Sequence, residues 1–474
     1  MQSILSVGID IGTSTTQVIF SRLSMENTAG YFTVPHISII SKDVIYKSDI
    51  YITPLKTRTL IDADAVGKIV EAEYSKAGFS PRDVNTGAVI ITGESARKEN
   101  SEEVLSRLSG FAGEFVVSTA GPDLEAIVAG KGSGAASYSD ENGVTVVNLD
   151  IGGGTSNIVL FDSGESKDRG CVDIGGRLIK LREDMTVTYI SESAQKIAKS
   201  VNVNIEVGSK TDEREIRKIC DRMAELLYEL VSGNGSQLLE DIKTPGSTDF
   251  KPTKKVRAVC FSGGVADLIS ENESDSFKYG DIGVILGRAI RDGKLYSEYR
   301  VIKANETIRA TVVGAGTYTT SVSGSTIDYT EGLFPLKNIP VLRFTESEQK
   351  NCFNGDIKAV AERIKWFLSQ SDSENAVIAM RGEQNPSYMA VKKLADTLSD
   401  AADSVLKDGL PVIVVLECDM AKILGSLMKE RLLDKRPVIS IDSVKVDHND
   451  FVDMGKPLMD GMVIPVVVKT LIFG

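Results

Sequence analysis

The feature of this sequence that most constrains its fold is a pattern that occurs twice, about 140 residues apart. In the first copy an apolar run enters Asp10-Ile11-Gly12, and a second strand-like run begins at Gln17. In the second copy Val144–Leu149 enters Asp150-Ile151-Gly152-Gly153-Gly154-Thr155, and Ser156–Phe161 follows. Strand-like runs on both sides of a glycine-rich turn predict a β-hairpin, whereas a Rossmann or P-loop unit continues into a helix. Two such hairpins indicate two related α/β halves.

Hydrophobic periodicity predicts the elements around the hairpins. Leu124–Gly130 predicts a helix of small residues, and Asp212–Val231 predicts an amphipathic helix with a capping residue at its start. Val256–Phe261 predicts a strand that enters Ser262-Gly263-Gly264, while the glycine-rich run Val313–Gly324 predicts a pair of strands with bulges. From residue 341 strands and helices alternate, which predicts a parallel sheet with covering helices. These segments are Val341–Phe344, Ile357–Ser369, Ala376–Met380, Met389–Leu406, Pro411–Leu416, Met420–Leu433 and Val438–Ile441, with a last strand at Ile464–Phe473.

Together these elements predict an α/β fold with two lobes and a C-terminal α/β extension. We expect the first lobe over residues 1–142 and the second over residues 143–290, with a polar surface excursion at 233–255. A C-terminal α/β region is expected over residues 291–474. A chain of 474 residues is long enough for two or three domains of ordinary size.

Composition excludes several classes of protein. With 42% hydrophobic and 25% charged residues the chain is not mainly disordered. A net charge of −12 repels phosphate backbones, so we expect no nucleic-acid partner. No apolar stretch approaches the roughly 20 residues that span a membrane, so no membrane partner is expected. Five scattered cysteines without a CxxC pair, and only two histidines, indicate a reducing cytoplasmic location and leave little room for zinc or His-based catalysis.

The two glycine-rich turns are suited to holding phosphate groups beside a magnesium ion. Glycine lets backbone N–H groups approach phosphate oxygens, and hydroxyl side chains add donors. One Asp-Ile-Gly alone is a weak signal, because hairpin turns favour Asp and Gly for conformational reasons, but two copies in the same context are not. Asp10 and Asp150 are expected to face each other across a cleft, where they suit a Mg²⁺ that keeps part of its water shell. The candidate phosphate-binding residues are Gly12, Thr13, Ser14, Thr15, Gly152, Gly153, Gly154 and Thr155.

These segments resemble a known superfamily, that of actin, the sugar kinases and the DnaK-type chaperones. Asp10–Ser14 and Asp150–Thr155 resemble its two phosphate loops, and Phe261-Ser262-Gly263-Gly264-Val265 resembles its adenosine loop. Leu124–Gly130 and Ile282–Ile290 resemble its two connecting helices, where small residues permit close crossing. The resemblance covers roughly residues 4–290 in the family's order. It implies a two-lobed actin-like ATPase core that binds ATP and Mg²⁺, with Gly263 and Gly264 close to the nucleoside.

The chain departs from this superfamily at two places. Its chaperones carry an acidic residue at the start of the first connecting helix, to orient the attacking water, and Gly121 stands there in this chain. Asn157 stands where those chaperones often carry a further Asp. We expect Glu125 to act on the water, because Asp123 precedes a helix and is typical of an N-cap. A cap or surface role for Glu125 is the alternative, and slow hydrolysis is expected.

A narrower resemblance covers nearly the whole chain. Thr92–Arg97, Ala120–Ala126, Gly455–Pro457 and Val466–Leu471 resemble the ethanolamine ammonia-lyase reactivating factors. This family implies a chaperone-like ATPase whose partner is the adenosylcobalamin-dependent lyase. It releases damaged cobalamin so that intact cofactor binds. The resemblance is compatible with a homo-oligomer and with association with a bacterial microcompartment.

Alternative functions and roles stay open at this point. A small-molecule kinase of the same fold needs a general base beside the acceptor hydroxyl, for which the sequence offers no candidate. A non-hydrolysing actin-like scaffold agrees with the departures described above. Glu94 and Arg97 fit either the cleft or an ordinary helix pair. Asp419, which follows the strand Pro411–Leu416, fits a ligand site or, more simply, an N-cap.

Overall fold

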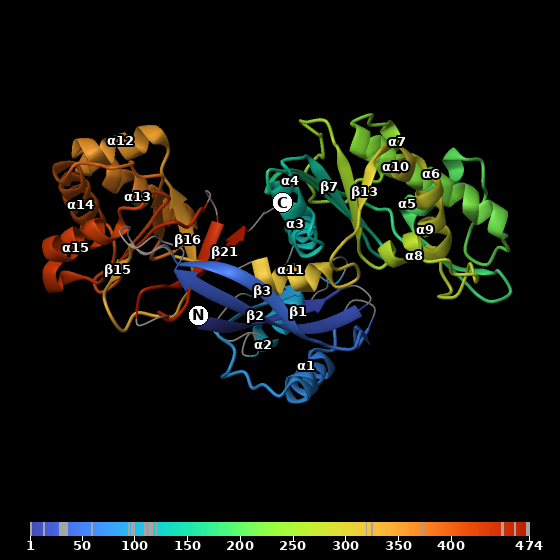
Figure 1. Ribbon diagram of the computed structural model, residues 1–474, viewed down its shortest axis with the longest axis horizontal. Coiled ribbons are helices and arrows are strands. Elements are labelled where there is room, and N and C mark those ends of the chain that lie inside the picture. The colour runs from blue at the N-terminus through green and yellow to red at the C-terminus, as the bar shows by residue number, and fades with distance from the viewer. Residues whose placement is uncertain are drawn as a thin grey trace.

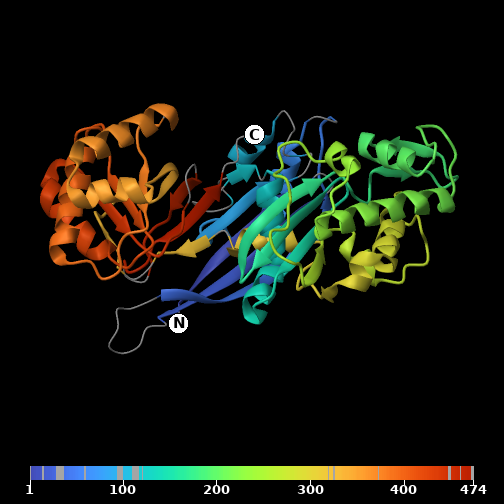
Figure 2. The ribbon, with the colours of Figure 1, turned by 90° about the horizontal axis from the view of Figure 1, so that it is seen from above.

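The computed structural model describes residues 2–12, 15–27, 37–57, 60–92, 95, 100–108, 111, 117–119, 121–318, 320–323, 326–371, 373–446, 450–458 and 461–470. It is an elongated α/β structure. Figure 1 and Figure 2 show the first lobe in the middle, the second lobe at one end and the C-terminal elements at the other. No helix within these ranges is long and apolar enough to cross a membrane.

The first lobe is built on a sheet with the strand order β3-β2-β1-β5-β6. Its strands are β1 (Gln2–Ile11), β2 (Thr15–Asn27), β3 (Ile37–Lys47), β5 (Thr86–Ile91) and β6 (Val117–Thr119), with β4 (Tyr51–Ile52) paired to β2. Alternate residues of β1, among them Val7 and Ile9, are buried on one face against α1 (Ala63–Ala77) and α2 (Ser101–Leu108). The period of two along the strand thus places these side chains together on one face of the sheet.

The second lobe repeats this topology with the strand order β9-β8-β7-β12-β13. Its strands are β7 (Val146–Ile151), β8 (Ser156–Asp162), β9 (Glu165–Val172), β12 (Ala258–Ser262) and β13 (Arg300–Ile302). In both sheets the first two strands form an antiparallel hairpin, in which Ile11 lies opposite Thr16 and Ile151 lies opposite Ser156. The predicted hairpins, the two related halves and the actin-like core are confirmed.

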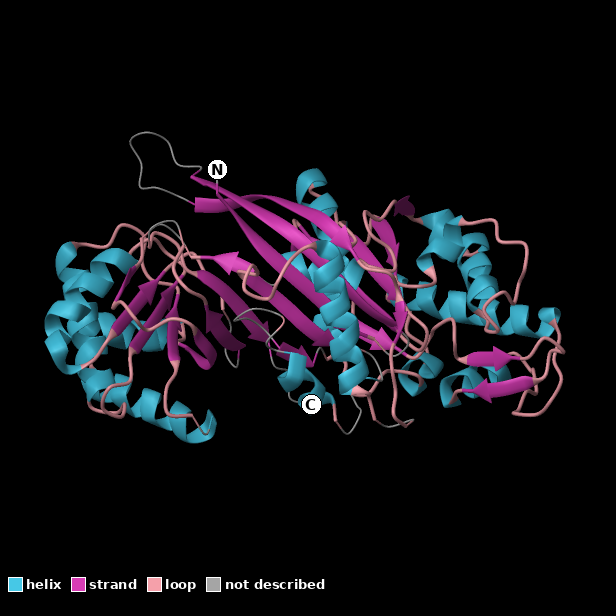
Figure 3. Ribbon diagram, turned by 90° about the horizontal axis from the view of Figure 1, so that it is seen from below, coloured by secondary structure: helices cyan, strands magenta, loops and turns pink. Residues whose placement is uncertain are grey.

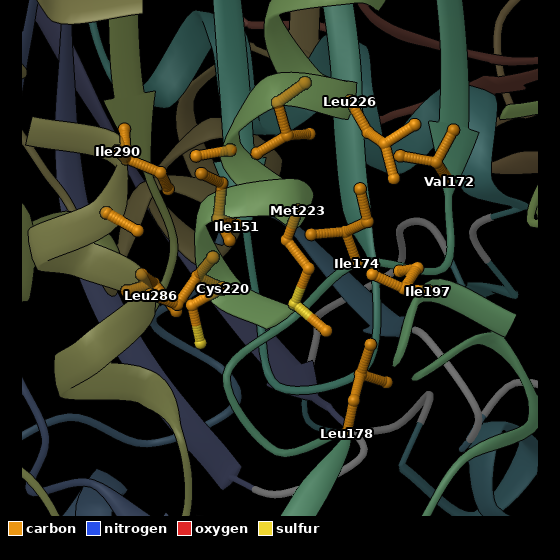
Figure 4. Close-up of a cluster of buried hydrophobic side chains, with 14 of the residues drawn as sticks. Ile151, Val172, Ile174, Leu178, Ile197, Cys220, Met223, Leu226, Leu286 and Ile290 are labelled. Atoms are coloured by element: carbon orange, nitrogen blue, oxygen red, sulfur yellow. The ribbon is translucent and has the colours of Figure 1, made fainter. Parts of the chain in front are cut away.

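The helices of the second lobe pack into one large apolar core. They include α5 (Glu192–Ser200), α6 (Glu213–Ser232), α7 (Gln237–Asp241), α8 (Ala266–Ser270), α9 (Gly283–Asp292) and α10 (Lys294–Glu298). Figure 4 shows Met223 from α6 and Leu286 from α9 in the same cluster as Ile151 at the end of β7. The amphipathic helix predicted over Asp212–Val231 is confirmed, and Asp212 caps it by accepting a hydrogen bond from the Glu215 amide at 2.8 Å. This core fixes the strand ends that carry the second glycine-rich turn.

Two helices cross between the lobes, and one of them differs from the prediction. They are α3 (Pro122–Gly132) and α11 (Ala310–Tyr318), which pack against each other, while α11 also contacts β1. A Cβ on Gly132 would lie 1.9 Å from the Ala310 carbonyl oxygen, and one on Gly314 would lie 2.0 Å from that of Val128. The backbones therefore approach so closely that only glycine fits at these two crossings.

The second connecting helix was predicted at Ile282–Ile290, and this prediction is wrong. That segment forms α9, which packs against α6 and α8 within the second lobe. The prediction of paired strands over Val313–Gly324 is also wrong up to residue 318, because α11 ends there and β14 (Thr320–Val322) follows. Packing of α11 against α3 and β1 outweighs the strand preference of its Thr and Val residues.

The C-terminal part contains an eight-stranded sheet with the order β14-β21-β20-β16-β17-β18-β19-β15. Its other strands are β15 (Asp328–Tyr329), β16 (Leu336–Arg343), β17 (Val377–Met380), β18 (Val412–Leu416), β19 (Val438–Ile441), β20 (Asp450–Met454) and β21 (Pro465–Thr470). Strands β16 to β19 are parallel, as predicted. The covering helices, seen in Figure 3, are α12 (Glu346–Asn354), α13 (Ile357–Ser371), α14 (Tyr388–Asp403) and α15 (Ala421–Leu432).

Elements after residue 290 also complete the two lobes. Strand β13 pairs with β12 in the second sheet, and α11 packs against β1 and α3. The C-terminal sheet meets the first lobe through β21, whose Val467 is buried in one cluster with Ala88, Val128 and Ala315. Strand β21 therefore shares a buried cluster with both helices that cross between the lobes.

Candidate functional site

A cavity of about 350 Å³ lies where the two glycine-rich turns face each other. Every residue predicted for the site and described by the structure lines it. These residues are Asp10, Gly12, Thr15, Glu125, Asp150, Gly152, Gly153, Gly154, Thr155, Gly263 and Gly264. Thr13 and Ser14, which were predicted with them, lie outside the described residues. The structure thus gathers parts of four distant segments around one opening.

The two turns have the same local geometry. The Gly12 amide donates to the Thr15 carbonyl at 2.8 Å, and the Gly152 amide donates to the Thr155 carbonyl at 2.9 Å. Next to the second turn, Gly263 has φ +85°, and a Cβ there would lie 2.5 Å from the Ile151 carbonyl oxygen. Glycine at this position therefore allows the loop after β12 to pack directly on the end of β7.

Asp10 and Asp150 occupy equivalent positions at the ends of β1 and β7 and are buried, with exposed fractions of 7% and 6%. Thr92 Oγ1 donates to Asp10 Oδ1 at 3.0 Å, and Ser262 Oγ donates to Asp150 Oδ1 at 2.6 Å. Burial raises the pKa of Asp10 to about 7, with a further rise from the charge of Asp150, while the Thr92 hydrogen bond opposes the rise. Burial likewise raises the pKa of Asp150 to about 6. A cation between them would relieve this unfavourable ionisation.

Two amide side chains occupy equivalent positions in the two hairpins, as the two carboxylates do. Gln17 lies opposite Asp10 in the first hairpin, and Asn157 lies opposite Asp150 in the second. Within the described part of the chain, Gln17 Oε1 and Asn157 Oδ1 are buried without a hydrogen-bond partner. From the sequence Asn157 was recognised only as a departure from the superfamily and Gln17 was not predicted, although both stand seven residues after their aspartates.

The donor set fits a magnesium ion that keeps much of its water. Two buried carboxylates supply the charge, and Gln17 lines the cavity beside Asp10 with its unpartnered amide oxygen. Across the ranges that the structure covers, no group of three His, Cys, Asp or Glu side chains is placed to hold a metal. Two carboxylates and one amide oxygen suit Mg²⁺, because this ion completes its coordination with water. They are too few for a metal that is coordinated by protein atoms alone.

Glu125 and Asp123 take different positions at the start of α3. Glu125 lines the cavity. Asp123 is 1% exposed and accepts hydrogen bonds from the Thr248 amide at 3.0 Å and from Arg169 Nε at 3.3 Å. These bonds join α3 to the segment after α7 and to β9. The N-cap position belongs to Gly121, so the prediction that Asp123 caps the helix is wrong. Of these two acids, only Glu125 reaches the cavity.

Of the remaining candidates the structure describes only Asp419, which does not line this cavity. Glu94 and Arg97 lie outside the described residues. Asp419 is not an N-cap as predicted, since Met420 precedes α15 without a side-chain capping bond. Asp419 instead lies near Asp442, whose pKa is raised to about 6 by burial, while the Thr326 hydrogen bond lowers it and the charge of Asp419 raises it.

One wall of the cavity was not predicted from the sequence. Arg177, Tyr279 and Asp281 line it together with Gly283 at the start of α9. Arg177 Nε lies 3.4 Å from Asp281 Oδ2, and the Arg177 side chain is 44% exposed. A signal was present in the sequence, because Arg177 follows a second Asp-Ile-Gly-Gly, at residues 173–176, after the one at residues 150–153.

Comparison with known proteins gives distant structures and near relatives. A Ppx/GppA family member from Aquifex aeolicus is 15% identical with a TM-score of 0.41, and covers 66% of this chain and 97% of its own. The ethanolamine utilization protein EutJ from Carboxydothermus hydrogenoformans is 16% identical with a TM-score of 0.34, over 67% of this chain and 90% of its own.

Sequence relatives are nearer and span the full length. The ethanolamine ammonia-lyase reactivase EutA of Salmonella typhimurium is 36% identical over 100% of this chain and 99% of its own length. The protein of the same name from Escherichia coli is 35% identical over the same shares. The family model for the ethanolamine utilisation protein EutA matches residues 2–474. This chain belongs to the EutA family.

Proposed function

We propose that this chain is an ATP-dependent reactivating factor for an adenosylcobalamin-dependent ethanolamine ammonia-lyase. The observation that carries the proposal is the pair of buried carboxylates, Asp10 and Asp150, between two equivalent glycine-rich turns that line one cavity. The partner is inferred from the two full-length relatives, both named as reactivases of this lyase. Damaged cobalamin would leave the lyase in the reaction, and intact cofactor would take its place.

The cavity offers separate groups for each part of Mg-ATP. Backbone N–H groups of the two turns would bind phosphate oxygens, and the loop at Gly263 and Gly264 would pass close to the nucleoside. Asp10, Asp150 and Gln17 would hold a Mg²⁺ ion, which neutralises phosphate charge when bound. Glu125, at the start of α3, would accept a proton from the attacking water.

The contacts of α3 and α11 supply a route from the cavity to the C-terminal sheet. A nucleotide that touches both turns favours the state in which the lobes lie close together, through its differential affinity for that state. Val128 of α3 and Ala315 of α11 are buried in one cluster with Val467 of β21. A change in the crossing of the two helices would therefore displace β21, and we propose that this alters affinity for the lyase.

A small-molecule kinase and a non-hydrolysing scaffold are the alternatives, and ATP turnover separates them. Purified chain with Mg-ATP and no acceptor is expected to release phosphate slowly, and Asp10→Asn is expected to abolish the release. Turnover only on addition of a hydroxyl acceptor would indicate a kinase. Nucleotide binding without turnover, in the presence of inactivated lyase as well, would indicate a scaffold.

A further inference from the structure

Arg177 is carried by a tight turn that packs directly on the second glycine-rich turn. The Gly176 amide donates to the Gly152 carbonyl at 3.0 Å, and the Arg177 amide donates to the Gly153 carbonyl at 2.7 Å. A Cβ on Gly175 would lie 2.5 Å from the Gly153 carbonyl oxygen, so the approach requires glycine there. The backbone of Arg177 is thus fixed against the loop proposed to bind phosphate.

Buried side chains on both sides hold this turn in place. Ile174 is fully buried and Leu178 is 5% exposed, and both belong to the core of the second lobe. Figure 4 shows Ile174 and Leu178 beside Met223 of α6 and near Ile197 of α5. Anchors on either side of Arg177 fix its backbone at one wall of the cavity.

The side chain of Arg177 runs across the phosphate turn. A Cβ on Gly153 would lie 3.2 Å from Arg177 Cδ and 3.5 Å from Arg177 Cγ, so the aliphatic stem lies over the Gly153 backbone. The guanidinium group then reaches Asp281, with 3.4 Å between Nε and Oδ2. The Arg177 side chain as a whole is 44% exposed, and it lines the cavity, where a ligand can reach it.

The lining of the cavity is mostly acidic, and Arg177 supplies its positive charge. Among the described residues that line it, Arg177 is the single cationic side chain. The acidic side chains of the lining are Asp10, Glu125, Asp150, Asp267, Glu271 and Asp281. A polyphosphate entering this cavity meets repulsion from the carboxylates, and the guanidinium group is the described side chain that attracts it.

We propose that Arg177 binds a phosphate group of the nucleotide and that it exchanges Asp281 for this phosphate when the nucleotide enters. This assignment rests on the proposed function. A guanidinium group presents a planar fork of donors that matches two phosphate oxygens, and such charge-assisted hydrogen bonds are strong. The exchange leaves Asp281 with a partner, because Asp281 Oδ1 accepts a hydrogen bond from the Gly283 amide at 2.9 Å.

Isothermal titration calorimetry of the full chain with ATP and with adenosine, both in the presence of Mg²⁺, tests the assignment. Arg177→Met is expected to weaken ATP at least about tenfold and adenosine less than about twofold, since the lost contact is to phosphate. Arg182→Met is the matched control, because it removes the same charge from an exposed position in the same segment outside the cavity lining. Its ATP affinity should equal that of the wild type.

Each other result overturns a defined part of the reasoning. Unchanged ATP affinity in Arg177→Met overturns the assignment of Arg177 alone, and equal weakening of ATP and adenosine places Arg177 on the nucleoside instead. Wild-type protein that does not bind ATP overturns the proposed function as well. Arg177→Lys retains the charge without the fork and should give intermediate ATP affinity, which decides the matter if the Met variant does not fold. Asp281→Asn should tighten ATP, and unchanged or weaker binding contradicts the exchange.

Discussion

Asp10→Asn is expected to stabilise the metal-free protein at neutral pH while it abolishes ATP turnover. The pKa of Asp10 is raised to about 7 from its ordinary value of 3.8, mainly because the carboxyl group is buried. The fold therefore disfavours the ionised form. The wild type loses stability from this group as the pH rises above about 4, and the loss is complete above pH 7. Asparagine has nearly the same shape and never ionises.

The size of the effect follows from the difference between the two pKa values. Each pKa unit corresponds to about 1.4 kcal/mol, so ionised Asp10 lowers the free energy of unfolding by up to about 4 kcal/mol. The asparagine oxygen can still accept the hydrogen bond from Thr92 Oγ1, which is 3.0 Å long in the wild type. Its new N–H group faces the cavity and loses part of its solvation, so we expect a net gain of about 1–3 kcal/mol at pH 8.

Urea unfolding followed by circular dichroism, with a chelator present and at several pH values from 5 to 8, measures this gain. The stability difference between Asp10→Asn and wild type should grow across this range. Asp83→Asn is the control of opposite sign, because hydrogen bonds from the Ser80 hydroxyl and amide hold the pKa of exposed Asp83 below its usual range. Asp83 thus stabilises the fold when ionised. Equal or lower stability of Asp10→Asn at pH 8 would refute the reasoning.

Three further predictions test other parts of the structure. Asp150→Asn should lower ATP turnover at least about tenfold, or about 1.4 kcal/mol of transition-state stabilisation, in a phosphate-release assay, and unchanged turnover contradicts its role. Gly314→Ala places a Cβ 2.0 Å from the Val128 carbonyl oxygen and should lower the free energy of unfolding by about 1–3 kcal/mol. Gly121→Ala, whose Cβ meets nothing within 4 Å, is the control, and equal stability of the two variants would contradict the close crossing. All five thiols should be free by mass analysis. Half-buried Cys418 should react first with a thiol reagent, because the other four cysteines are buried. A disulfide bond, or equal reactivity of all five thiols, would contradict this prediction.

The hairpins and their site could be predicted because their signals are local. Asp10 and Asp150 each precede a glycine-rich turn between strand-like runs, and turn chemistry together with alternation specifies such a hairpin. The parallel strands of the C-terminal sheet could be predicted equally well, because segments with the hydrophobic periodicity of a helix alternate with them. These are features that a short window of sequence contains.

The connecting helix could not be recognised in the same way. The segment of α11 is rich in Val, Thr and Gly, residues that weaken a helix and favour strands and turns. What decides its conformation is the close crossing with α3, where Gly314 meets the Val128 carbonyl. That contact joins residues far apart in the sequence, so the local periodicity of hydrophobic residues does not predict it.

Arg177 and Gln17 were missed for a related reason. Neither belongs to a recognised turn, and their importance arises only when Gly175 packs on Gly153 and when Gln17 pairs with Asp10 across the hairpin. The repeated Asp-Ile-Gly-Gly at residue 173 and the equal seven-residue offsets of Gln17 and Asn157 were available as patterns. Their meaning depends on tertiary contacts.

Recovery of activity by a cobalamin-inactivated ethanolamine ammonia-lyase tests the central claim most directly. The lyase, taken from the same source as this chain, would be incubated with the purified protein, Mg-ATP and fresh adenosylcobalamin, and its turnover of ethanolamine would be followed. The account predicts recovery with the wild type and ATP together, and none without ATP or with Asp10→Asn. Failure of the wild type to restore activity, or equal recovery in the absence of ATP, would contradict it.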